Sequence, residues 1–279
     1  SLMWAIEPVL AKLSYQQTNF IHTSAIRAIV VTSIALLYVI LSKKTSLRVT
    51  KKEASVLMYI AFVGTLFADL LYFYALTSIP VINAVLIGHL QPVFIILLSF
   101  LILKKDRLTR IDYLGIIFLM ISAGLVTTKT LGNAASLHFG SMGDAVVLFA
   151  TIAWATTAIA MRKYLSNLHA GIITFYRFFM ASIIFGFYLI INKMFTIYSY
   201  QIAIGIIVGL GTICYYEGLK RIKAAQVSGL ELGAPVFAAI IGFIVLGEII
   251  TWMQILGILL LIIGISLLSK KERKTPQIP

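Results

Sequence analysis

Long apolar stretches recur along the whole chain and limit what it can fold into. Of its 279 residues, 60% are hydrophobic and only 12% are charged, whereas a soluble globular domain has about 25% charged residues. Within a bilayer every backbone polar group must be satisfied inside the protein, so helices and closed barrels are the structures that span it. Runs of about 18–23 apolar residues can cross as helices. The sequence therefore predicts an all-α integral membrane protein.

Ten stretches are predicted to be transmembrane helices, although the first is shorter than a full span. Because Ser1 already lies inside an apolar run, we expect that several residues precede it in the natural protein. The start of the chain does not resemble a signal peptide, since it has neither a basic region nor a small-residue cleavage site. The predicted helices cover residues 2–14, 21–42, 54–76, 82–103, 111–128, 144–161, 170–191, 200–219, 225–246 and 252–268.

Basic residues concentrate in alternate connections, and this pattern predicts the orientation. Most of the 23 Lys and Arg residues lie in one set of connections and the C-terminal tail, whereas the other set contains only Lys129 and Lys193. The positive-inside rule places the basic set, and with it both termini, in the cytoplasm. The net charge of +13 is then mainly a topology signal, and we expect no nucleic-acid partner. The basic set comprises Lys43, Lys44, Arg48, Lys51, Lys52, Lys104, Lys105, Arg107, Arg110, Arg162, Lys163, Lys220, Arg221, Lys223, Lys270, Lys271, Arg273 and Lys274.

The chain also contains an internal duplication. The two halves share a tryptophan, an arginine and a Pro-Val-Phe motif in the same order. With an odd number of helices per half, the second half must enter the membrane upside down, and such inverted repeats are a common plan for alternating-access carriers. The sequence predicts a first five-helix repeat at 1–128, an external connection at 129–143, a second repeat at 144–268 and a basic cytoplasmic tail at 269–279. The matched residues are Trp4 and Trp154, Arg27 and Arg177, and Pro92 and Pro235.

These motifs resemble the ten-helix EamA-type members of the drug/metabolite transporter superfamily. The resemblance extends over essentially the whole chain and is closest in the segment Gly247-Glu248…Thr251…Gln254…Gly257…Gly264. It implies a secondary transporter that exports a small polar metabolite, with amino acids as the leading class. The compact chain with few loop residues suggests the plasma membrane of a prokaryote. Because the first half has Lys104-Lys105-Asp106 where the second has Gly-Glu, we expect Glu248 to be a structural, interfacial residue.

Charged and titratable residues inside the first-half spans form one group of candidate site residues. An ionisable group within hydrocarbon costs at least ~2.5–3.5 kcal/mol on insertion scales and is a functional candidate by default. Helix geometry places Glu7, Arg27, Asp69 and His89 roughly 10 Å below the external interface. Arg27 needs an acidic partner, so either Glu7 or Asp69 should pair with it and leave the other acid in an apolar setting. We predict that Asp69 and His89 couple transport to protons, while Arg27 and Glu7 organise the outer gate. The alternative is a static ion pair and a histidine bonded to a backbone carbonyl.

A second group of candidates is predicted near the inner ends of the second-half helices. It contains Trp154, Arg177 and Glu231, so the sequence predicts two polar layers, one on each side of the membrane midplane. Glu231 precedes Pro235 by four residues, on a turn whose backbone bond the proline removes. It is predicted to be a substrate or proton site, or else the salt-bridge partner of Arg177. Helix breaks at proline in corresponding positions of two halves indicate a transport site, and the matching first-half residues are His89, Gln91 and Pro92.

Aromatic and glycine residues give two further expectations. Tyr72 and Tyr215 occupy equivalent positions of the halves and either face one cavity or lie at the membrane interface. Gly205 and Gly209 permit close helix contact, which we expect inside a monomer rather than in a dimer.

Other classes of function are disfavoured. The four histidines are scattered, without an HExxH spacing, and a Gly-x-Ser-x-Gly elbow is absent, so we expect neither enzymatic activity, nor a cofactor, nor a metal. The single Cys214 excludes an intramolecular disulfide. The expected partners are a small-molecule substrate, protons and the lipid bilayer. A passive channel remains the alternative, because a polar-lined helical bundle can also conduct.

Overall fold

The computed structural model describes residues 1–42, 47–91, 93–95, 97–98, 110–135, 140–221 and 233–269, and within these ranges the regular structure is helical throughout. Glu231, Pro92, the Lys104–Asp106 segment and the tail after residue 269 lie outside the described residues. Wherever both ends of a predicted helix are described, the observed ends lie within three residues of the prediction. The helices are α1 (Leu2–Ser14), α2 (Phe20–Leu41), α3 (Lys51–Tyr59), η1 (Ile60–Asp69), α4 (Leu70–Ala75), α5 (Val81–Gly88), α7 (Arg110–Thr128), α8 (Leu131–Ala135), α9 (Met142–Tyr164), α10 (Ala170–Ile191), α11 (Ser199–Arg221), α13 (Gly233–Leu246) and α14 (Trp252–Ser269).

Several helices have the length and composition of membrane spans, which identifies a multi-pass membrane protein. Five are long and apolar enough to cross a bilayer, and shorter apolar helices accompany them. Many of their large apolar side chains are exposed on the surface of the protein, as expected for helices that are surrounded by hydrocarbon rather than water. The five are Phe20–Leu41, Lys51–Ala75, Met142–Tyr164, Ala170–Ile191 and Ser199–Gly218.

The third predicted span differs from a regular helix in its winding. It runs without interruption from Lys51 to Ala75, but its middle, η1, is a π-helix of 10 residues. π-helices are rare, usually form single-turn bulges and often occur at functional sites. The predicted span is helical throughout, but the π winding of its middle, which ends at Asp69, was not predicted from the sequence.

The fourth predicted span, 82–103, is interrupted. α5 ends at Gly88, and His89 and Leu90 form a turn before helical residues resume at Gln91. A proline has no N–H to donate to the carbonyl four residues earlier, and the residue four before Pro92 is Gly88. α5 thus ends at Gly88, the residue whose carbonyl would otherwise accept a hydrogen bond from the backbone N–H of residue 92. Pro235, the counterpart of Pro92, is buried in α13.

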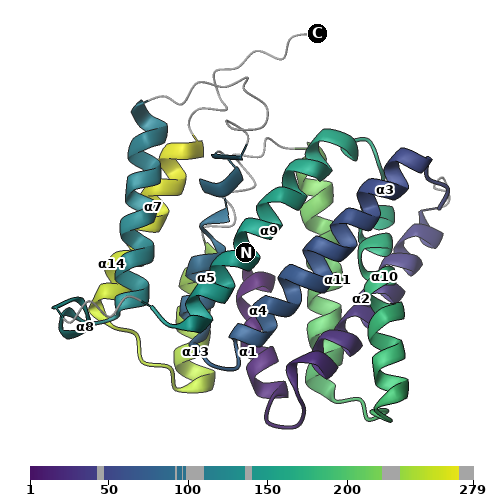
Figure 1. Cartoon of the computed structure of the whole chain (residues 1–279), viewed down its shortest axis with the longest axis horizontal. Helices are drawn as coiled ribbons and strands as arrows, with labels where there is room; N and C mark the ends of the chain where they lie inside the picture. The colour runs from purple at the N-terminus through teal and green to yellow at the C-terminus, as the bar shows by residue number, and fades with distance from the viewer. Residues whose placement is uncertain are drawn as a thin grey trace.

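The two halves interleave. Equivalent helices pack in pairs, α2 against α10 and α7 against α14, and the equivalent residues Thr32 and Ser182 share a hydrogen bond of 2.9 Å. The first helix of each half packs into the other half, because α1 contacts α11 and α13 while α9 contacts η1, α4 and α5. Figure 1 shows α7 and α14 together on the left and α2, α10 and α11 on the right, with α1, α5 and α9 between them.

An ion pair joins three elements at the ends of the helices remote from the basic connections. Lys12 Nζ donates to Glu248 Oε1 at 2.9 Å. Both carboxylate oxygens of Glu248 also accept from the backbone N–H of Val81, at 2.9 Å each. Val81 is the first residue of α5, and a carboxylate at a helix N-terminus satisfies an orphan donor and complements the helix dipole. Glu248 therefore fastens α1 and the α13–α14 connection to the start of α5.

A buried polar chain fastens the same end of α5 to two further helices. Gln254 Nε2 donates to Asn83 Oδ1 at 2.9 Å, and Asn83 Nδ2 donates to Asp144 Oδ1 at 2.9 Å. All three side chains are buried. Asp144 and Gln254 also form capping boxes at the starts of α9 and α14, with Ser141 and Thr251 as their partners. The start of α5 is thus held by hydrogen bonds from α9 and α14.

Close helix contacts depend on glycine inside the chain. A Cβ added at Gly205 would lie 2.5 Å from Val30 Cβ, and one at Gly209 would lie 3.2 Å from Ile34 Cδ1. Both contacts are made by α11 on α2, so these two glycines serve packing between the halves of one chain.

We predict that Gly205→Ala lowers the apparent melting temperature of the purified protein by several degrees, because overpacking typically costs about 1–3 kcal/mol. The matched control is Gly186→Ala in α10, where an added Cβ meets nothing within 4 Å. A helical Gly→Ala change without a clash stabilises by up to ~1 kcal/mol, so this variant should melt at or above the wild-type temperature. Equal melting temperatures of the two variants would contradict the packing described for α2 and α11.

Candidate substrate and coupling site

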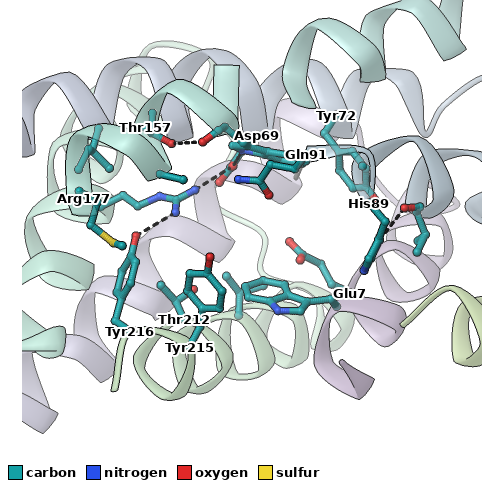
Figure 2. Close-up of a pocket in the computed structure, with 18 of the residues that line it drawn as sticks. Glu7, Asp69, Tyr72, His89, Gln91, Thr157, Arg177, Thr212, Tyr215 and Tyr216 are labelled. Atoms are coloured by element: carbon teal, nitrogen blue, oxygen red, sulfur yellow. Dashed lines mark hydrogen bonds and ion pairs between the residues drawn. The ribbon is translucent and has the colours of Figure 1, made fainter. Parts of the chain in front are cut away.

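A pocket of about 220 Å³ lies between the two halves and is lined by residues of both. This volume is slightly below the ~300–1,000 Å³ typical of ligand pockets, which favours a small ligand. Its described charged side chains are Glu7 of α1, Arg27 of α2, Asp69 at the end of η1 and Arg177 of α10. Figure 2 shows Glu7, Asp69 and Arg177 around one shared space. With both acids ionised, the formal charge of this group is zero.

Arg27 binds both acids. Its Nη1 donates to Glu7 Oε1 and its Nη2 to Asp69 Oδ2, each at 2.7 Å, and all three side chains are buried. Its guanidinium also lies over the ring of Phe73, 4.4 Å from the centroid, a favourable cation–π position. The expectation that one acid would lack a partner is wrong, because the planar guanidinium presents separate N–H groups to two carboxylates.

Asp69 joins the two equivalent arginines. Its Oδ1 accepts from Arg177 Nη2 at 3.1 Å and from Trp154 Nε1 at 2.8 Å. Arg177 donates further to Thr65 Oγ1 at 2.9 Å and to the Tyr216 hydroxyl at 3.3 Å. Trp154 and Arg177 therefore meet the first-half acids in one cluster, and the prediction of two separate polar layers is wrong for them. Counting residues along straight spans ignores helix tilt and the interleaving of the halves.

The two halves contribute unequally to this cluster. Both supply an arginine, but within the described part of the chain the acids of the pocket, Glu7 and Asp69, come from the first half. At the repeat offsets, Glu7 corresponds to Thr157 and Asp69 to Thr212, and both threonines line the pocket. Sequence reasoning missed these threonines, although alignment of the repeats could have identified them. The pocket thus has titratable carboxylates on one side and neutral hydroxyl groups at the equivalent places.

His89, in the turn after α5, and Gln91, just after that turn, line the pocket. His89 Nδ1 donates to the Val85 carbonyl at 2.7 Å, since a carbonyl oxygen can only accept. This is the backbone bond considered as the alternative for His89, and it fixes the orientation of the ring at the pocket.

Two residues that line the pocket each precede a proline by four positions. Pro8 lies inside α1, and the residue four before it is Trp4; the residue four before Pro92 is Gly88. Because proline has no N–H, neither carbonyl can receive the usual helical hydrogen bond from the residue four positions later. Both Trp4 and Gly88 line the pocket.

Aromatic rings form much of the remaining wall. Tyr72 packs on Trp154 with ring centroids 5.3 Å apart, and Tyr215 packs on Tyr216 at 5.6 Å. Tyr72 and Tyr215 line the same pocket from the two halves, which agrees with the expectation that they face one cavity. Flat or cationic parts of an organic solute can pack against such walls.

The predicted site residues are distributed as follows. Pro235 is buried but is not among the described lining residues, and Glu231 and Pro92 lie outside the described part of the chain. Within the described residues, no three His, Cys, Asp or Glu side chains are grouped as they would be to hold a metal ion. The predicted residues that line the pocket are Asp69, His89, Glu7, Gln91, Tyr72, Tyr215, Trp154, Arg27 and Arg177.

Comparisons with known proteins agree with this architecture. A transporter from Synechocystis is 32% identical over 234 residues, covering 78% of this chain and 66% of the relative. A transporter from Methanothermobacter thermautotrophicus is 26% identical over 231 residues, covering 79% of this chain and 66% of the relative. The chain thus spans about two thirds of the length of these two proteins. The pseudopaline exporter CntI of Pseudomonas aeruginosa is 22% identical over 242 residues, covering 85% of this chain and 83% of the exporter.

A solved crystal structure shares the fold, with a TM-score of 0.70 and 18% identity over 98% of this chain and 95% of the other. The model of the EamA-like transporter family matches residues 1–128 and 141–270, nearly the whole sequence. The chain belongs to the EamA-like transporter family.

Proposed function

We propose that this protein is a secondary transporter, not an enzyme, that moves a small polar metabolite across the cell membrane by alternating access. An amino acid or a related compound is the proposed substrate, and export is the proposed direction. The family is one of transporters, and a relative is an exporter. The observation that carries the proposal is the small pocket between the halves, in which every described charge has a partner within hydrogen-bonding distance.

The proposed topology has ten transmembrane helices in two inverted repeats, 1–128 and 144–268, with 129–143 outside. Both termini and the tail 269–279 are in the cytoplasm. Three features support this arrangement: equivalent helices pair, the first helix of each half packs into the other half, and the basic residues collect at one end. The polar clusters around Glu248 and Asn83 then lie at the outer side and hold it closed.

Coupling to protons is proposed to occur at Asp69, as antiport. With Asp69 ionised, the four charges in the pocket sum to zero; when it is protonated, the sum is +1. A substrate ammonium group is therefore repelled by the protonated pocket and accepted by the ionised one, so proton and substrate exclude each other. His89, and Glu231 outside the described residues, are further candidates for carrying protons.

Reconstitution into proteoliposomes tests this function. With a radiolabelled mixture of the proteinogenic amino acids as the probe, we expect saturable uptake, counterflow, and acceleration by an imposed pH gradient. Counterflow without a response to the pH gradient would refute the proton coupling, but it would still support the proposal that the protein is a carrier. Conduction without saturation or counterflow would instead identify a passive channel.

Variants of two paired residues should separate structure from coupling. Arg27→Met leaves two buried acids with one arginine, and breaking a buried pair costs about 3–5 kcal/mol, so the folded yield should fall sharply. Asp69→Asn imitates the protonated carboxyl group that occurs in the proposed transport cycle. In this variant Arg27 still has its ion pair with Glu7. This variant should retain most of its folded yield, measured by size-exclusion chromatography in detergent, but lose its response to the pH gradient.

An equal loss of folded yield in Arg27→Met and Asp69→Asn would make Asp69 a structural residue. An Asp69→Asn variant with the wild-type response to the gradient would exclude it as the coupling site.

A further inference from the structure

Trp154 contacts Asp69 in an unusual way, because one indole N–H reaches two acceptors of the same helix. Its Nε1 lies 2.8 Å from Asp69 Oδ1 and 3.3 Å from the carbonyl oxygen of Gly64. These two residues are five positions apart. In an α-helix with 3.6 residues per turn, such residues point about 140° apart around the axis. The wider π-helical turn bonds each N–H to the carbonyl five residues earlier, and this brings Asp69 above Gly64.

The indole is itself held in place. Its ring packs on Tyr72, with the centroids 5.3 Å apart, and α9 packs along η1 and α4. The hydrogen-bond donor therefore approaches the end of η1 from the neighbouring helix α9. Trp154 joins the two ends of the π-turn that terminates at the proposed coupling carboxylate.

The second half pairs the equivalent helices but differs in winding and, where it is described, lacks this contact. Trp4, the counterpart of Trp154, lies on α1, which packs on α11 as α9 packs on η1. α11 is a regular α-helix at the equivalent positions 207–212, and Thr212 replaces Asp69. Among the described residues, no hydrogen bond is found for the Trp4 indole. The π-turn, the carboxylate and the indole hydrogen bond thus occur together in one half and are all missing from the described part of the other.

We propose that Trp154 is a positioning residue for proton coupling: its indole N–H holds the π-turn from Gly64 to Asp69 and aims Asp69 Oδ1 at Arg177. This role rests on the proposed function of Asp69. An indole donor stabilises the ionised carboxylate more than the protonated one, so its loss should change how transport responds to protons. Among the described residues, the other charged or titratable groups that line this pocket are Glu7, Arg27, Tyr72, His89, Arg177, Tyr215 and Tyr216.

The first test compares Trp154→Phe with Trp4→Phe and Trp252→Phe in proteoliposomes. All three changes remove an indole N–H and keep an aromatic ring, but among the described residues only Trp154 donates to a carboxylate; Trp252 is exposed at the start of α14. The readout is the ratio of amino-acid uptake rates with and without a pH gradient. Because a hydrogen bond to a charged group is stronger than one between neutral groups, Trp154→Phe should reduce this ratio about tenfold, or to unity where the wild-type ratio is below about ten.

Trp4→Phe and Trp252→Phe should keep the wild-type ratio, whatever their absolute rates. A wild-type ratio in Trp154→Phe, or an equal loss in Trp4→Phe, would overturn the proposal.

The second test does not depend on transport. The chain has three tryptophans, so protein labelled with 5-fluorotryptophan gives three ¹⁹F NMR signals that single Trp→Phe variants assign. Asp69→Asn should move the Trp154 signal and leave that of Trp252 in place; an unmoved Trp154 signal would overturn the proposal. If the wild-type protein ignores a pH gradient, proton coupling fails, and the NMR result alone decides whether Trp154 positions Asp69.

Discussion

The centre of this protein depends on a network of buried ion pairs. Its middle member, the carboxylate of Asp69, lies within hydrogen-bonding distance of Arg27 and Arg177, the equivalent arginines of the two halves, and of the Trp154 indole. Four helical elements, α2, η1, α9 and α10, therefore meet at one side chain. Two guanidinium groups in a low-dielectric interior require compensating charge, and Glu7 provides the rest of it. The same ion pairs therefore hold the two halves together at the centre and set the charge of the pocket.

Duplication accounts for the architecture, and divergence between the copies accounts for the chemistry. The equivalent Thr32 and Ser182 still bond to each other, and both arginines are retained. The acids are not retained, since threonine stands opposite Glu7 and Asp69 in the second half. In the proposed cycle the proton is taken up at the Asp69 carboxylate, while the equivalent place in the second half has only the neutral hydroxyl of Thr212. The clusters of Glu248 and Asn83 add a second asymmetry by fastening one end of α5.

Much of the fold follows from the sequence, because apolar runs and proline positions act locally. The helix ends lie within a few residues of the predicted ones, and α5 stops at Gly88, four residues before Pro92. The π-winding of η1 has no comparable local signal, since its apolar residues suit either helix. The contact between Asp69 and Arg177 also escaped prediction, because it depends on how α10 and η1 cross. The predicted role of Glu231 as a substrate or proton site stays a prediction, because this residue lies outside the described part of the chain.

The central claim is that a proton and a substrate ammonium group exclude each other at Asp69. Calorimetric titration of the detergent-purified protein, in buffers of different ionisation enthalpy, counts the protons exchanged on ligand binding. The ligand is the amino acid that most stabilises the protein in a thermal-shift screen. The account predicts release of up to about one proton per ligand by linkage, increasing as the pH is lowered, and none from Asp69→Asn. Binding without proton release at any pH, or the same release from Asp69→Asn, would contradict it.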